Sequence, residues 1–161
     1  MQLEEYTIIF QAKEEIYDEI TERYLLNYAK FDMNKLRQIN GNTKDKIHNA
    51  LFYILHHFIN GVEIESINEK INYREVILLL TSTGYSEDKV DYIVSQTGKD
   101  ITLFLTDLVE DGKKKNEIRH DFLTENIVES LFIMYMGIQE LWLLFICDDI
   151  DSIFEKNFNM T

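Results

Sequence analysis

The chain has 161 residues, no proline and six glycines, and its 29 acidic residues against 16 lysines and arginines give a formal net charge of −13. The length suits one domain, the shortage of turn residues disfavours an all-β fold, and the acidity disfavours direct binding to a nucleic-acid backbone. The composition, with 21 isoleucines and three alanines, is typical of an AT-rich genome such as that of a low-GC bacterium or its phage.

The first predicted helix covers about residues 3–31. Apolar residues recur along it at helical spacing, and carboxylates fill the opposite side. These carboxylates belong to Glu14, Glu15, Asp18, Glu19 and Glu22. A face of this kind can steer and pair with basic groups on another protein.

The clearest helix of the sequence follows the Asn40-Gly41 turn. Asn42 or Thr43 can cap its start, and Gly61 ends it. Its apolar residues recur at i, i+3, i+4 and i+7 spacing, which predicts one buried stripe. The stripe consists of Ile47, Ala50, Leu51, Ile54, Leu55, Phe58 and Ile59. His56 lies beside the stripe and His57 faces away from it, so this pair does not converge on one metal ion.

Residues 64–71 make a short amphipathic piece, and three compact helices are expected after it, over about residues 73–83, 87–97 and 100–110. Glycines mark the ends of the first and third of these helices. Ser86 can cap the second, whose first turn carries acidic residues that favour the helix dipole. This spacing predicts several compact helices joined by short turns.

The last third of the chain predicts a long helix over 117–147, with a restart near Thr124, and a short helix over about 150–157. Residues 127–146 are apolar almost all the way round, so the helix must be wrapped by its own chain or by a partner. Charged and amide side chains within it disfavour a membrane span. We therefore predict an all-α fold: a single-domain helical bundle, 1–161, of about six or seven helices around a long apolar C-terminal helix.

Residues 77–109 contain a helix, a Gly-aromatic turn and two further helical segments. The pattern consists of Thr83-Gly84-Tyr85, Val90, Ile93, Val94, Asp100-Ile101 and Leu108-Val109. It resembles the three-helix ubiquitin-associated (UBA-like) domains over about a fifth of the chain. It departs from them at Phe104, where that family prefers a small residue. The resemblance implies that Gly84 and Tyr85 present an apolar contact surface.

Two other interpretations of the same segment stay open. One is a buried part of the helical core. The other is a helix-turn-helix, but its recognition helix would bring Glu87, Asp88 and Asp91 against DNA phosphates. Near Tyr85, these three carboxylates instead make a second acidic face that suits a basic protein.

Motifs for catalysis or cofactor binding are absent from the sequence. Glu117 and His120 have the Glu-x-x-His spacing of di-iron helices, but no second copy accompanies them. Cys147 lies between apolar and acidic residues, which do not activate a thiol. We therefore expect no enzyme activity, catalytic residue, metal or cofactor. A single cysteine and an N-terminus unlike a signal peptide favour a cytoplasmic location.

The leading hypothesis is a non-enzymatic acidic protein–protein interaction module that neutralises a basic protein partner, as inhibitors, immunity proteins and antitoxins do. Its expected contact residues are Glu14, Glu15, Asp18, Glu19, Glu22, Gly84, Tyr85, Glu87, Asp88 and Asp91. The alternative is a helical ligand-binding or regulatory domain that forms a homodimer through its C-terminal helix. Neither hypothesis involves a membrane or direct contact with nucleic acid.

Overall fold

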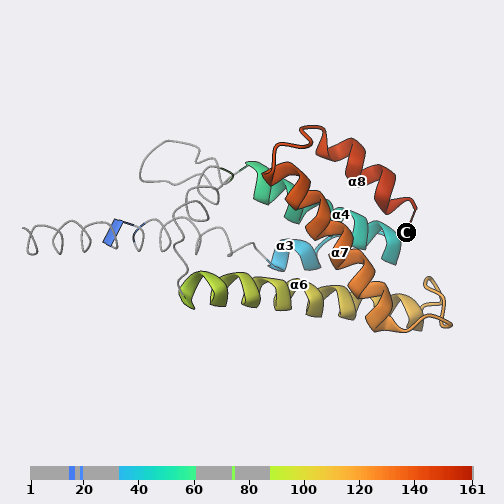
Figure 1. Ribbon diagram of the computed structural model, residues 1–161. Coiled ribbons are helices and arrows are strands. Elements are labelled where there is room, and N and C mark those ends of the chain that lie inside the picture. The colour runs from blue at the N-terminus through green and yellow to red at the C-terminus, as the bar shows by residue number, and fades with distance from the viewer. Residues whose placement is uncertain (1–14, 17–18, 20–32, 61–73, 75–87, 161) are drawn as a thin grey trace, which may run out of the picture. The chain divides into compact units, whose positions relative to one another are not determined.

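The computed structural model describes residues 15–16, 19, 33–60, 74 and 88–160 (Figure 1). These residues form helices and no strand, which confirms the all-α class for this part of the chain. Five helices are bounded here: α3 (Met33–Arg37), α4 (Thr43–Asn60), α6 (Asp88–Lys114), α7 (Thr124–Leu143) and α8 (Ile150–Phe158). The amphipathic piece over 64–71 lies outside the described residues, as do the predicted helix over 73–83 apart from Arg74 and most of 3–31. Six or seven helices for the whole chain therefore stays a prediction.

The chain divides into two compact units. One consists of Met1–Phe31 with Phe58–Ser95, and the other of Asp32–His57 with Gln96–Thr161. The single domain expected from the sequence stays a prediction. The second unit holds most of the described residues.

The core of the second unit is built from one apolar face of each helix. On α4, the five residues Ile47, Ala50, Leu51, Ile54 and Leu55 are all buried, as their spacing predicts. The other buried apolar side chains are Leu36 of α3, Ile101, Phe104, Leu105 and Val109 of α6, Val128, Leu131, Tyr135, Ile138 and Trp142 of α7, and Ile150, Phe154 and Phe158 of α8. Removing these surfaces from water is the main force that holds the helices together.

The start of α4 has both features expected from the sequence, a glycine turn and a side-chain cap. Gly41 has φ +128°, a conformation that side-chain-bearing residues rarely adopt. Asn42 Oδ1 accepts a hydrogen bond from the Asp45 amide at 2.9 Å, and Asp45 Oδ2 accepts one from the Asn42 amide at 3.3 Å. This reciprocal pair is a capping box. Asn42 is therefore the capping residue, one of the two alternatives that the sequence leaves open.

The helix α6 corrects one expectation. The predicted break between helices over 87–97 and 100–110 is wrong, because α6 continues without interruption from Asp88 to Lys114. Gly98 lies inside it, and a Cβ there would be 3.5 Å from the Phe132 ring of α7. The glycine thus stands where a neighbouring side chain comes close, and it does not end the helix. The UBA-like pattern needs two helices where α6 is one.

A second correction concerns the long apolar helix over 117–147. Its helical part, α7, is 20 residues long and begins at Thr124, whereas α6 has 27 residues. Figure 1 shows α7 (orange) crossing the C-terminal part of α6 and leading to α8 (red). The C-terminal helix is α8, and its bounds agree within one residue with the expected 150–157. The chain itself does not cover α7 on all sides, because Ile133 and Met136 are exposed.

Candidate interaction surface

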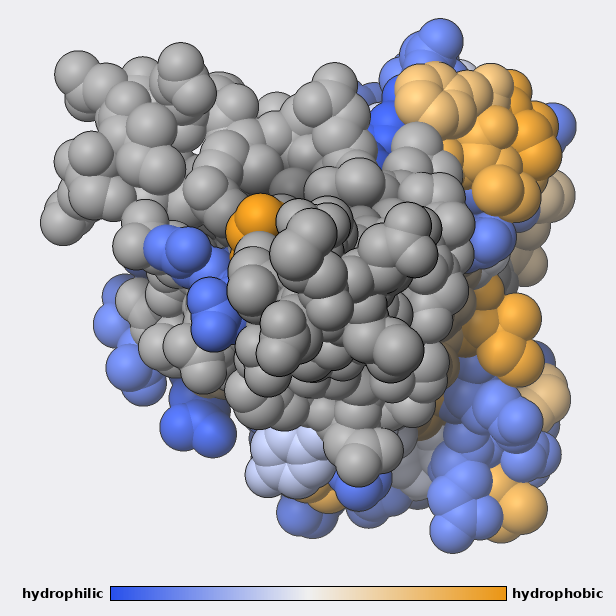
Figure 2. Space-filling view, turned by 60° about the vertical axis from the view of Figure 1, so that its left-hand side comes forward, coloured by the Kyte–Doolittle hydropathy of each residue, from blue (hydrophilic) through white to orange (hydrophobic). Residues whose placement is uncertain are grey.

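The connection between α7 and α8 exposes three apolar residues in a row. Leu144, Phe145 and Ile146 are 53%, 61% and 66% exposed. Single apolar residues are common on protein surfaces, but a continuous group of large ones marks an interaction site more often. Figure 2 shows apolar side chains gathered at the upper right of the described surface, with hydrophilic ones beside them. We name residues 144–146 the apolar turn.

The backbone of the apolar turn is a helix C-terminal motif with an unusual residue in it. The Ile146 amide donates to the Leu141 carbonyl at 3.0 Å, and the Phe145 amide donates to the Trp142 carbonyl at 3.1 Å. This is the Schellman arrangement, whose left-handed position is normally a glycine. Phe145 occupies that position with φ +58°. The chain thus places a bulky aromatic residue where it strains the backbone, a feature that clusters at functional sites.

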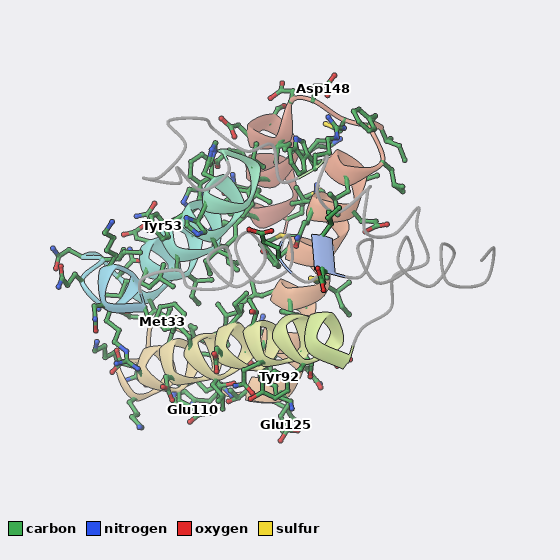
Figure 3. The ribbon with its side chains drawn as sticks, turned by 90° about the vertical axis from the view of Figure 1, so that its left-hand side faces the viewer. Met33, Tyr53, Tyr92, Glu110, Glu125 and Asp148 are labelled. Atoms are coloured by element: carbon green, nitrogen blue, oxygen red, sulfur yellow. The ribbon has the colours of Figure 1, made fainter. Side chains whose placement is uncertain are left out.

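Carboxylates follow the apolar turn immediately. Asp148, Asp149 and Asp151 are all exposed. Asp149 Oδ1 accepts from the Ser152 amide at 3.2 Å and so caps α8. Figure 3 places Asp148 at the connection between α7 and α8, at the opposite end of α7 from Glu125. The apolar turn is therefore followed by exposed carboxylates in the same connection and at the start of α8.

The helix α8 fixes the position of this surface from one side. Its residues Ile150, Phe154 and Phe158 recur at i, i+4 and i+8 and are buried. On the side toward α4, Glu155 and Asp151 contact the imidazoles of His48 and His56 at 2.7 and 2.8 Å. The apolar turn is therefore held between two packed helices.

The loop from 115 to 123 pairs its charged groups within itself or with nearby helices. Asn116, with φ +59°, ends α6 in a second Schellman motif. A hydrogen bond from Lys115 holds the pKa of Asp111 below its ordinary value, and Asp111 in turn raises the pKa of Lys115. Arg119 and Asp121 act on each other in the same way: the Arg119 pKa is raised and the Asp121 pKa is lowered. These pairings use cations that could otherwise bind an anionic ligand.

Glu117 and His120 do not form the di-iron pattern that their spacing suggested as one interpretation. Both lie between α6 and α7, outside any helix. The Glu117 carboxylate accepts from Thr43, and His120 Nε2 contacts Asn116 Oδ1 at 3.2 Å. Among the residues that the structure describes, no group of three or more histidine, cysteine or acidic side chains could hold a metal ion.

Only four of the ten contact residues expected from the sequence belong to the described part of the chain. Glu15 and Glu19 are exposed and one helical turn apart, and Asp88 and Asp91 lie in the first turn of α6. The six others, Glu14, Asp18, Glu22, Gly84, Tyr85 and Glu87, lie outside it. The two acidic faces expected from the sequence therefore stay predictions.

Sequence reasoning missed the apolar turn because its residues continue the apolar run of α7. In sequence, Leu144, Phe145 and Ile146 are as apolar as the buried residues before them. The sequence does change from apolar residues to Asp148 and Asp149, which indicates that a helix ends nearby. This change does not show at which residue the helix ends and the turn begins.

Comparison of the chain with protein-family models, with curated proteins and with solved structures gave no match. Within the described residues, none of the helices has the length and apolar character needed to cross a membrane.

Proposed function

We propose that this protein is an acidic protein–protein interaction module that binds a basic protein, with the apolar turn as its anchor. The observation that carries the proposal is the adjacency of three exposed apolar residues, 144–146, and the exposed carboxylates of Asp148, Asp149 and Asp151. Aromatic anchors with charged surroundings provide most of the binding energy in many interfaces. A partner of this surface has an apolar pocket with lysines or arginines around it.

The net charge of −13 supports the same partner class. A strongly negative protein attracts basic proteins over distances up to a Debye length, about 8–10 Å in physiological salt, and repels acidic ones. Binding of this kind can neutralise a basic protein by covering its working surface. An inhibitor, immunity protein or antitoxin of a bacterium or its phage acts in this way, without a catalytic step or a cofactor.

The faces expected from the sequence remain part of this proposal. Glu15 and Glu19 are exposed carboxylates that can extend an acidic surface. Their contribution is tested separately from that of the apolar turn, because they belong to the other compact unit.

To test the proposal, wild type and variants are immobilised. The amount of basic protein that each one retains is then measured at low and at high salt. Asp148→Asn/Asp149→Asn removes two carboxylates beside the turn, and asparagine can still cap α8. Asp107→Asn/Glu129→Gln removes two exposed charges from α6 and α7 as a matched control. The first variant should weaken binding about tenfold or more and reduce its salt dependence, whereas the control should bind nearly as well as wild type. Equal loss in both variants would mean that only net charge matters, and the anchor would be rejected.

A homodimer through α7 is the second candidate, and exposed Ile133 and Met136 on that helix favour it. It predicts that the purified chain sediments as a dimer and that Ile133→Glu/Met136→Glu makes it monomeric. A wild-type monomer at micromolar concentration would exclude it.

A further inference from the structure

The connection between α3 and α4 contains an asparagine followed by a glycine. Asn40 and Gly41 are both exposed and lie outside any helix. Such a pair is chemically labile, because the nitrogen of the second residue can attack the side-chain carbonyl carbon of the asparagine. Glycine has no Cβ to hinder that attack and leaves the backbone free to rotate. How fast the pair reacts then depends on how firmly the fold holds its atoms.

Two neighbouring asparagines are held in different ways. In the described part of the chain, the Asn40 side chain and the Gly41 amide make no hydrogen bond. The Asn42 side chain, in contrast, accepts from the Asp45 amide at 2.9 Å, and the residue after it is the buried, β-branched Thr43. Asn42 is therefore fixed as a helix cap, whereas the Asn40 side chain can turn toward the Gly41 nitrogen.

The turn itself requires the glycine of the labile pair. Gly41 has φ +128°, which favours glycine, and a Cβ there would be 2.8 Å from Asp45 Cβ. A larger residue, which would slow the attack, does not fit this turn. The geometry that starts α4 therefore also keeps Asn40 next to a glycine.

We propose that Asn40 is a site of spontaneous deamidation in the folded protein, and that the isoaspartate product loosens the start of α4. The Gly41 nitrogen loses its proton to water and bonds to Asn40 Cγ. The Cγ–Nδ2 bond breaks, ammonia leaves, and a succinimide ring remains. Water then opens the ring: cleavage of the new N–Cγ bond gives aspartate, and cleavage of the original peptide bond gives isoaspartate. Water is the only other reactant, and either product adds one negative charge.

The isoaspartate product changes the backbone directly before α4. Its main chain runs through the former side chain and is longer by one carbon. The contacts that fix this end of α4 follow immediately: the capping box of Asn42 and Asp45, and the hydrogen bonds from Thr43 to Glu117. The longer backbone displaces this cap. Aspartate at position 40 keeps the normal backbone length and leaves the cap in place.

The second Asn-Gly pair of the chain, Asn60-Gly61, provides an internal control for the site. Asn60 is the last residue of α4, and a helical backbone keeps the next nitrogen away from the side-chain carbonyl carbon. Folded protein is incubated at neutral pH and digested, and the aspartate and isoaspartate peptides are separated and identified by mass spectrometry. Asn40 should convert about threefold faster than Asn60 or more, because even a helix end opens only part of the time.

The same incubation in guanidinium chloride separates the fold from the local sequence. In the unfolded chain, both Asn-Gly pairs should convert at similar rates. Asn40→Gln should remove the faster conversion from the folded protein and keep the slower one, and Asn60→Gln is the matched control with the reverse effect. Two outcomes would overturn the site: conversion of Asn40 no faster than that of Asn60 in the folded protein, or an equally large difference in denaturant.

Thermal unfolding tests the effect on α4. Protein enriched in isoaspartate at position 40 should melt about 2–4 °C below fresh protein, as expected for the loss of a helix cap. Asn40→Asp carries the same added charge in a backbone of normal length, and should melt like wild type. Equal melting of the enriched and fresh proteins would refute the displaced cap. None of these measurements involves a partner, so their results are independent of the proposed function.

Discussion

Glu117 Oε2 accepts two hydrogen bonds from Thr43, at 2.7 Å from its amide and 2.6 Å from its hydroxyl. The two residues are 74 positions apart in sequence. The contact joins the loop after α6 to the first turn of α4, where backbone amides have no partner within the helix. A carboxylate at that end is also favoured by the helix dipole. A residue that resembled a metal ligand in sequence is a helix cap in the structure.

Replacing Glu117 by glutamine should change how stability depends on pH. Hydrogen bonds from the Thr43 hydroxyl and amide lower the Glu117 pKa from its ordinary value of 4.5. A lowered pKa contributes stability that is present above pH 4.5 and is lost as the pH falls through the folded value. Urea denaturation of Glu117→Gln should therefore show a smaller loss of stability between pH 5 and 3 than wild type.

The dependence that remains in Glu117→Gln comes from groups such as Asp111 and Asp121, whose pKa values are also lowered. Glu129→Gln, at an exposed position on α7, serves as the control and should follow wild type. Identical acid profiles for wild type and Glu117→Gln would show that the cap contributes nothing measurable.

Two glycine-to-alanine substitutions should act in opposite directions. Gly112 is buried, and a Cβ there would be 2.6 Å from Thr43 Cγ2 and 2.9 Å from Ile118 Cδ1. Gly112→Ala should lower the free energy of unfolding by about 1–3 kcal/mol, because the packed side chains must shift. Gly137 has nothing within 4 Å of a Cβ, so Gly137→Ala should raise it by about 0.5–1 kcal/mol. Thermal unfolding of each variant measures these effects. A gain in stability for Gly112→Ala would contradict the close packing at Gly112, and a loss for Gly137→Ala would contradict the open space at Gly137.

The Phe145→Gly variant should weaken binding without lowering stability. The backbone at Phe145, with φ +58°, suits glycine, so the substitution should leave stability unchanged or raise it by up to about 1 kcal/mol. The same change removes the central side chain of the apolar turn. If the turn anchors a basic partner, affinity should fall by about tenfold or more while the melting temperature does not fall. Retained affinity in a folded Phe145→Gly protein would exclude Phe145 as the anchor.

Phe154 should be among the most sensitive positions of α8. Its side chain is fully buried and contacts the rings of His48 and Phe52. Phe154→Ala should cost about 3–5 kcal/mol through lost burial and the cavity left behind. Denaturant unfolding measures this cost. A loss below about 1 kcal/mol would mean that α8 contributes little to the packing of its unit.

Local patterns in the sequence were sufficient for several elements. The apolar spacing of residues 47–55 predicted which face of α4 is buried, and Asn42 was one of two named caps. The expected short helix over about 150–157 agrees with α8, Ile150–Phe158, to within one residue. These features depend on neighbours within a few residues, which is the range over which helix caps and periodicity act.

Long-range packing decided the features that the sequence alone left open or misassigned. The sequence predicted two helices over 87–97 and 100–110, but α6 is continuous through Gly98, where the Phe132 ring of α7 comes close. The partner of Glu117 could not be predicted, because nothing in its local sequence refers to Thr43. The alignment of His48 and His56 with α8 depends on the same docking of distant helices.

The sequence by itself determined the helical class, the acidity and the buried stripe of α4, because composition and periodicity are local properties of the chain. Only the tertiary structure decided which apolar residues stay exposed. Trp142 and Phe145 are three positions apart in one apolar run, yet Trp142 is buried and Phe145 is exposed. The physical reason is that burial depends on where the helix ends and on what packs against it. At Phe145 the backbone turns left-handed and leaves the helix axis, and the side chains of Phe145 and Ile146 are exposed there.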